Sequence, residues 1–207
     1  MALKRGITPQ SDPASNPESP FDFGTAVKQL SDQDPALRRA SVHALAKHPE
    51  AVGALVDRLK KEEMGLVRQS ILTALVGIGD AAAVSGFAEC LHSEDANLRN
   101  GAIEALKLLP DRTAPFIPAL LADPNSDVRI LTISILESLK YAEVESWLIS
   151  IVEKDTHVNV CGAALDLLAE VGSQHALEPI QRLKQRFEHE PYVQFAADLA
   201  LKRIRGN

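Results

Sequence analysis

The chain has few aromatic residues, few cysteines and no excess of positive charge. Aromatic residues make up 4% of the 207 residues, and Leu and Ala dominate the apolar set instead, which favours helix over sheet. The two cysteines, Cys90 and Cys161, do not suggest a disulfide framework. The formal net charge of −6 argues against general affinity for nucleic acids or anionic membranes, because phosphate binding needs clustered Lys and Arg.

Long hydrophobic runs are also missing. No apolar stretch approaches the roughly 18 residues of a membrane span. The first ten residues, MALKRGITPQ, lack the apolar core of a secretory signal. We therefore expect a soluble, cytoplasmic protein that binds neither membranes nor nucleic acids.

The first 20 residues differ from the rest in composition. The stretch TPQSDPASNPESP holds four prolines among small polar residues and nothing that can pack. Because such a segment cannot offset the entropy lost on ordering, residues 1–20 are predicted to be a disordered tail. It is interpreted as a spacer, with a docking peptide or a phosphorylation site as the alternative.

From residue 21 onward the chain repeats a helical pattern. Four segments align without gaps: ALRRASVHALAKH (36–48), LVRQSILTALVGIG (66–79), NLRNGAIEALKLL (97–109) and DVRILTISILESL (127–139). Weaker copies occupy 159–172 and 192–204. One aligned position holds, in order, Arg38, Arg68, Arg99, Arg129, Cys161 and Gln194, at spacings of 30, 31, 30, 32 and 33 residues. Four arginines in register indicate a true repeat.

Each copy also has a leading half with apolar residues at helical spacing. These halves lie at 50–62, 81–93, 112–123, 142–155 and 174–187. The unit is therefore a hairpin of a first helix, A, and a second helix, B. Asp34, Asp95 and Asn125 stand where B helices need N-caps, and Gly79 and Gly172 stand where C-cap glycines belong.

The B-helix pattern, D-x-x-V/L-R-x-x-A-x-x-A-L, resembles the HEAT repeat. It is most similar to the short bacterial HEAT-like kind that also occurs in phycobilin lyases. The resemblance implies an all-α protein, a right-handed α-solenoid (an α-α superhelix) of about six HEAT-like hairpins over residues 21–207, of bacterial origin. The last two copies depart from the pattern by lacking the arginine.

The aligned arginines are predicted to form a structural ladder along the seam between repeats. Arg38, Arg68, Arg99 and Arg129 each stand near the start of a B helix, at the margin of its buried face. Each can reach an Asp or Asn of the preceding turn, such as Asp34, Asp95 or Asn125. Binding of a ligand such as phosphate is the alternative role.

The resemblance also implies that B helices line the concave face of the solenoid. The positions expected to be exposed there include a moderately acidic set, predicted as the protein-binding site: Glu104, Lys107, Glu137, Asp166 and Glu170. Such a groove suits a protein or peptide partner with a basic segment. An ordinary solvated polar face is the competing interpretation.

Signals for catalysis are weak. His189-Glu190 is similar to the iron-binding His-Glu pairs of HEAT-type deoxyhypusine hydroxylases, but those sites use several pairs and this chain has one. Cys161 has no neighbouring base and is expected to be a packed thiol, and Trp147 is expected to lie in the core. No catalytic, cofactor-binding or metal-binding residue is therefore predicted.

These observations favour a protein-binding adaptor or scaffold that is not an enzyme and needs no cofactor. The alternative is a HEAT-like enzyme or enzyme subunit, either of the bilin lyase type or of the metal-dependent hydroxylase type. Bound iron, chromophore chemistry or a partner protein distinguishes these classes.

Overall fold

A computed structural model of the chain describes residues 21–206, so the predicted tail at 1–20 lies outside the described residues. Residues 21–206 form α-helices and short 3-10 helices, without a strand. The α-helices are α1 (Phe23–Gln29), α2 (Pro35–Leu45), α3 (Val52–Leu59), α4 (Gly65–Ile78), α5 (Ala81–Cys90), α6 (Ala96–Leu108), α7 (Pro110–Thr113), α8 (Ile117–Leu121), α9 (Ser126–Leu136), α10 (Glu143–Lys154), α11 (Val158–Val171), α12 (Leu177–Arg186) and α13 (Pro191–Arg205). The 3-10 helices are η1 (Pro49–Ala51), η2 (Ala114–Phe116) and η3 (Gln174–Ala176).

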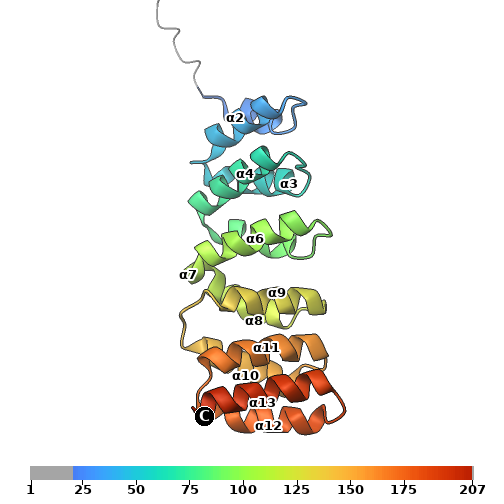
Figure 1. Cartoon of the computed structure of the whole chain (residues 1–207). Coiled ribbons are helices and arrows are strands. Elements are labelled where there is room, and N and C mark those ends of the chain that lie inside the picture. The colour runs from blue at the N-terminus through green and yellow to red at the C-terminus, as the bar shows by residue number, and fades with distance from the viewer. Residues whose placement is uncertain (1–20, 207) are drawn as a thin grey trace, which may run out of the picture.

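The helices pair into six hairpins stacked in one column (Figure 1). The B helices α2, α4, α6, α9, α11 and α13 lie one above another on one side, and the A helices α1, α3, α5, α7 with α8, α10 and α12 lie behind them. Buried Leu, Ile, Val and Ala side chains join all the hairpins in one continuous core. The predicted all-α solenoid of about six HEAT-like hairpins is confirmed.

Local capping explains where several B helices begin and end. The side chains of Asp34, Asp95 and Asn125 accept hydrogen bonds from the first backbone N–H groups of α2, α6 and α9, as predicted. Gly79 ends α4 with φ 58°, the left-handed conformation that glycine adopts without strain. Gly172 is the C-cap of α11, as predicted, but with φ −72° it adopts an extended conformation and not the left-handed one of Gly79.

The A half of the fourth hairpin is broken, where the sequence predicts one helix over 112–123. The chain forms α7, η2 and α8 in succession, and each of these segments contains a proline, at Pro110, Pro115 and Pro118. Proline lacks the backbone N–H that a continuous helix needs and crowds the preceding turn. The last of these segments, α8, is therefore only five residues long.

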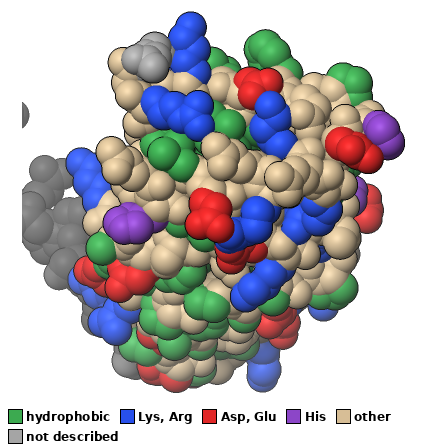
Figure 2. Space-filling model, turned by 90° about the horizontal axis from the view of Figure 1, so that it is seen from below, with side chains coloured by type: hydrophobic (Ala, Val, Ile, Leu, Met, Phe, Trp, Pro, Cys, Tyr) green, Lys and Arg blue, Asp and Glu red, His purple; other side chains and the backbone are tan. Residues whose placement is uncertain are grey.

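Neighbouring hairpins pack closely on the A side of the column, and its C-terminal end is covered by a mixed polar and apolar surface. On the A side, α5 comes so close to α3 that a Cβ added to Gly86 would lie 2.4 Å from a methyl carbon of Val56. At the C-terminal end of the column, Lys, Arg, Asp and Glu side chains are interspersed with apolar ones over the exposed face (Figure 2). A mixed polar surface of this kind suits a closing repeat, which has no further neighbour to cover it.

The aligned arginines lie near the start of the B helices α2, α4, α6 and α9, and their guanidinium groups reach the turns that precede these helices. Each donates a hydrogen bond to the backbone carbonyl of the residue six positions earlier, at 2.6–2.9 Å. The acceptors are, in order, Asp32, Glu62, Ser93 and Asp123. Within each turn the acceptors are thus backbone carbonyls and not the predicted capping side chains, and Asp34, Asp95 and Asn125 instead accept hydrogen bonds from the backbone N–H groups of their own helices.

Three of the arginines also bind a carboxylate of the following hairpin. The ion pairs are Arg38–Glu62 at 2.8 Å, Arg68–Asp95 at 2.7 Å and Arg129–Asp155 at 2.7 Å. One guanidinium thereby joins its own turn to the next turn along the column. These bonds fix the spacing between successive turns, and with it the spacing between B helices.

Two junctions differ from this pattern. At the third, His92 binds Asp123 at 3.0 Å, and Arg99 keeps only its bond to Ser93. At the fifth, Arg186 of α12 reaches back to donate to the carbonyl of Asp155 at 2.7 Å. In the first four hairpins the equivalent carbonyl binds the aligned arginine, so Arg186 replaces the arginine that is missing at Cys161.

Glu62 is the most deeply buried acid of the seam, with a side chain 1% exposed. Burial alone would raise the pKa of this carboxyl group. Hydrogen bonds from Arg38, from Arg58 and from the backbone N–H of Met64 outweigh that effect, and the pKa of Glu62 falls from its ordinary 4.5 to about 2. The ionised form is thus strongly favoured in the folded state.

The seam predicts unequal effects of removing its arginines. Arg38→Ala leaves the Glu62 carboxylate buried without its main partner and should lower the free energy of unfolding by about 3 kcal/mol or more. Arg99→Ala removes one hydrogen bond and should lower it by about 1 kcal/mol. Urea unfolding followed by circular dichroism measures both values, and equal losses would contradict a stabilising role for the ion pair.

The low pKa of Glu62 predicts a pH-dependent contribution to stability. Because the folded pKa lies below the unfolded one, the contribution is complete above about pH 4.5 and is lost as the pH falls through 2. At pH 7, Glu62→Gln should lower the free energy of unfolding by about 3 kcal/mol, and the difference from wild type should shrink towards pH 2. The exposed neighbour Glu63→Gln is the control, and its effect should stay near zero at every pH.

Candidate functional site

The B-helix face carries three furrows, each between two neighbouring B helices. Their volumes are about 220 Å³ between α2 and α4, about 550 Å³ between α4 and α6, and about 280 Å³ between α9 and α11. The predicted protein-binding residues lie along or beside the second and third furrows. The structure therefore places them on one face but not in one site.

The furrow between α4 and α6 has an apolar floor and a polar rim. Leu72, Val76 and Leu108 supply apolar surface, and the side chain of Leu108 is 68% exposed. Glu104 stands on the rim and binds Lys107 at 3.4 Å, so this predicted pair partly neutralises itself. The furrow is a shallow apolar strip with carboxylates beside it.

The furrow between α9 and α11 brings three predicted acids together. Glu137 comes from α9, and Asp166 and Glu170 come from successive turns of α11. Partial burial raises the pKa of Asp166, Arg203 of α13 opposes the shift, and the neighbouring Glu170 adds to it. The negative charge is therefore concentrated at the fourth and fifth hairpins, away from Glu104.

The sequence analysis did not identify two apolar side chains on the B helices. Phe195 of α13 is 70% exposed, and Ile130 of α9 lines the furrow between α9 and α11. Each directly follows the repeat position that holds arginine in the first four copies. The register of the repeats was thus a signal that could have identified both positions.

The expectation that Trp147 belongs to the core is wrong. Its side chain is only partly buried and lines a cavity between α8 and α10 on the A side. The cause is the break in the fourth hairpin, because the short α8 leaves the indole partly uncovered. The remaining apolar residues of α10 that the sequence assigns to the core, Val144, Leu148 and Ile151, are buried.

The two thiols are buried, and His189 lies on the surface. Cys161 is buried and donates to the carbonyl of Asp155, and burial raises its pKa. Burial also raises the pKa of Cys90, to about 11, so both thiols are protonated at neutral pH. His189 is exposed and pairs with the adjacent Glu188 at 3.3 Å. Among residues 21–206 no three His, Cys, Asp or Glu side chains gather closely enough to hold a metal ion.

None of the helices between residues 21 and 206 has both the length and the apolar character required to cross a lipid bilayer.

Comparison with known proteins identifies the repeats. The family model for HEAT repeats matches residues 25–107 and 113–206. The chain is also 32% identical over 153 residues to the bilin biosynthesis protein PecE of Mastigocladus laminosus. The match covers 72% of this chain and 56% of PecE, so the chain spans about half the length of this relative.

Solved structures show similar helical repeats at low sequence identity. The complex of CpcE and CpcF of phycocyanin lyase from Nostoc sp. PCC7120 is 19% identical with a TM-score of 0.38, covering 97% of this chain and 99% of that one. Human deoxyhypusine hydroxylase is 15% identical with a TM-score of 0.47, covering 89% and 85%.

The comparison with PecE corrects one expectation from the sequence. The chain is predicted not to be an enzyme, but its relative at 32% identity is a protein of bilin biosynthesis, and this favours the lyase-type alternative. The identity of the repeats themselves follows from the family model, which matches most of residues 25–206. The chain belongs to the HEAT-repeat family.

Proposed function

We propose that this chain is a lyase-type subunit of bilin biosynthesis that works together with a protein partner. The observation that carries the proposal is the similarity to PecE over 72% of the chain. The aligned region is 56% of that relative, and in this proposal a partner protein takes part in the activity.

The acidic furrow of the B-helix face is the surface we assign to the partner. Glu137, Asp166 and Glu170 concentrate negative charge there, and Ile130 lines the same furrow with apolar surface. A partner segment with basic residues flanking an apolar one complements both features. Glu104 is left out of this surface because Lys107 already pairs with it.

The chain's own thiols do not suit covalent attachment of a bilin. Cys90 and Cys161 are buried, and their raised pKa values keep them protonated. We therefore expect the thiol of an acceptor protein to add across a carbon–carbon double bond of the bilin, so that a carbon–sulfur bond forms and the thiol proton passes to carbon. In this proposal the chain binds and positions the reactants.

A chromophore-attachment assay tests the function. Apo-phycocyanin and phycocyanobilin are incubated with host-cell extract depleted of this chain, and the purified chain is then added back. We expect about tenfold more coloured phycocyanin that survives denaturing electrophoresis when the chain is present, since positioning accelerates attachment. Attachment that is equally fast without the chain would contradict the lyase-type function.

Charge reversal tests the partner surface. Affinity capture from host-cell extract should retain a partner on the wild-type chain and lose it on Glu137→Lys/Glu170→Lys, because the reversed charges repel a basic segment. Glu104→Lys is the matched control on the same face and should retain the partner. Retention by all three proteins would rule out the acidic furrow as the binding surface.

A further inference from the structure

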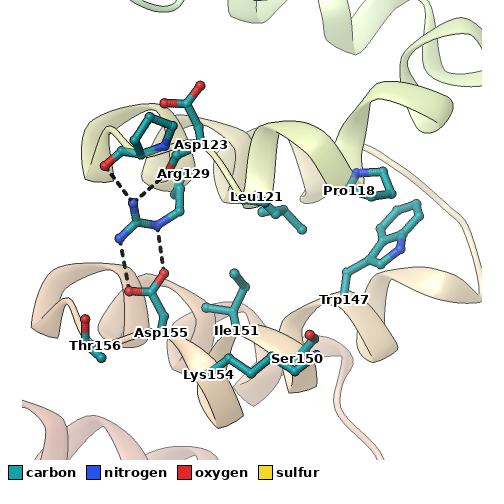
Figure 3. A pocket seen from close by; sticks show the side chains of 12 residues that line it. Pro118, Leu121, Asp123, Arg129, Trp147, Ser150, Ile151, Lys154, Asp155 and Thr156 are labelled. Atoms are coloured by element: carbon teal, nitrogen blue, oxygen red, sulfur yellow. Dashed lines mark hydrogen bonds and ion pairs between the residues drawn. The ribbon is translucent and has the colours of Figure 1, made fainter.

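A second cavity of about 550 Å³ lies on the A side, between α8 and α10 (Figure 3). Its volume falls within the roughly 300–1,000 Å³ typical of small-molecule sites. Pro118 and Leu121 of α8 face Trp147 and Ile151 of α10 across it, and the Arg129–Asp155 ion pair closes one end. The cavity thus has apolar and aromatic walls and one polar end.

The sequence of α8 explains why this space stays open. In the preceding hairpin, His92 follows α5 and crosses to Asp123, but the equivalent position after α8 is Ala122, which has no group to make such a bridge. Side chains of A helices also bridge other junctions, as in Lys60–Glu89 and Arg182–Glu153. Within residues 21–206, only Arg129 of a B helix forms an ion pair across the junction between α8 and α10.

The charge available to a ligand in this cavity is positive. The Arg129 guanidinium is already bonded to Asp155, and the Asp123 carboxylate points away from the cavity (Figure 3), where it binds His92. Lys154 lines the cavity, is exposed and forms no ion pair within residues 21–206. Its ammonium group can therefore bind an anionic group of a ligand.

The indole of Trp147 adds a flat aromatic wall with a free donor. Its N–H makes no hydrogen bond to any residue from 21 to 206, and its ring borders the cavity. Aromatic side chains stack well on conjugated planar molecules, and an indole N–H readily donates to a carbonyl oxygen. Ser150 lines the same wall and supplies a hydroxyl group.

The furrow between α4 and α6 has the same volume as the cavity between α8 and α10, but its charge is negative and it lacks an aromatic wall. Its rim carries Glu63 and also Glu104, whose charge Lys107 partly neutralises. Its arginine, Arg68, is bonded to Asp95, and no aromatic residue lines it. An anionic conjugated molecule is therefore repelled there and favoured in the cavity between α8 and α10.

We propose that the cavity between α8 and α10 binds the bilin, a linear tetrapyrrole with two carboxylate side chains. The conjugated rings lie against Trp147, and one carboxylate binds Lys154. This inference rests on the proposed function, because that function supplies the bilin as the ligand. It places the bilin on the opposite side of the column from the partner surface.

Biliverdin binding to the purified full chain tests the assignment. Binding is followed by visible absorption and by quenching of Trp147, the only tryptophan of the chain. Lys154→Gln should weaken binding about tenfold, and Ser150→Phe, which fills the cavity, should weaken it at least as much. Thr73→Phe, which fills the furrow between α4 and α6 in the same way, should leave binding unchanged.

The outcomes of these binding measurements test the proposed bilin site separately from the proposed lyase-type function. Weaker binding in Thr73→Phe with unchanged binding in both cavity variants would overturn the site and leave the function standing. If the wild-type chain binds no biliverdin, the inference fails, and the attachment assay with partner present decides the function independently. Circular dichroism checks that each variant folds, and because Lys154 is exposed, its replacement should not disturb folding.

Discussion

The architecture depends on one interaction, the hydrogen bonding of a guanidinium group to a backbone carbonyl in the first five A–B turns. A HEAT-type hairpin cannot bury its apolar faces alone, so its position is defined only by its neighbours. An arginine that binds its own turn and a carboxylate of the next hairpin links those two turns directly, as Arg38 and Arg129 do. Apolar packing supplies the stabilisation, and these directional bonds set the offset between hairpins.

Once the turns are linked in this way, the two sides of the column acquire different surfaces. On the B side, facing helices leave shallow furrows whose chemistry depends on a few positions per repeat. On the A side, the contact of Gly86 with Val56 and the Lys60–Glu89 ion pair close the junction between α3 and α5, and the Arg182–Glu153 ion pair bridges α10 and α12. The proline-broken fourth hairpin interrupts this packing, and the cavity beside Trp147 results.

In the proposed function, this division lets one acidic chain meet two ligands of opposite charge. The net charge of −6 favours basic partners, and the cluster of Glu137, Asp166 and Glu170 is the surface proposed for them. An anionic bilin needs a positively charged site, and Lys154 supplies that positive charge in the proposed A-side cavity. With the two surfaces on opposite sides of the column, a bilin and a partner can be held together without competing for the same residues.

The sequence by itself determined the succession of hairpins, several caps and the register of the arginines, although the A half of the fourth hairpin is broken where one helix was predicted. These features are local, because helical periodicity and capping residues act within a few positions. A repeat of about 30 residues can be recognised by aligning the sequence with itself. Only the tertiary structure decided which groups meet. Arg38 finds Glu62 24 residues away, and Arg186 reaches back 31 residues to Asp155. The separation of Glu104 from the other acids and the exposure of Trp147 likewise depend on how the hairpins stack, which a repeat period does not specify.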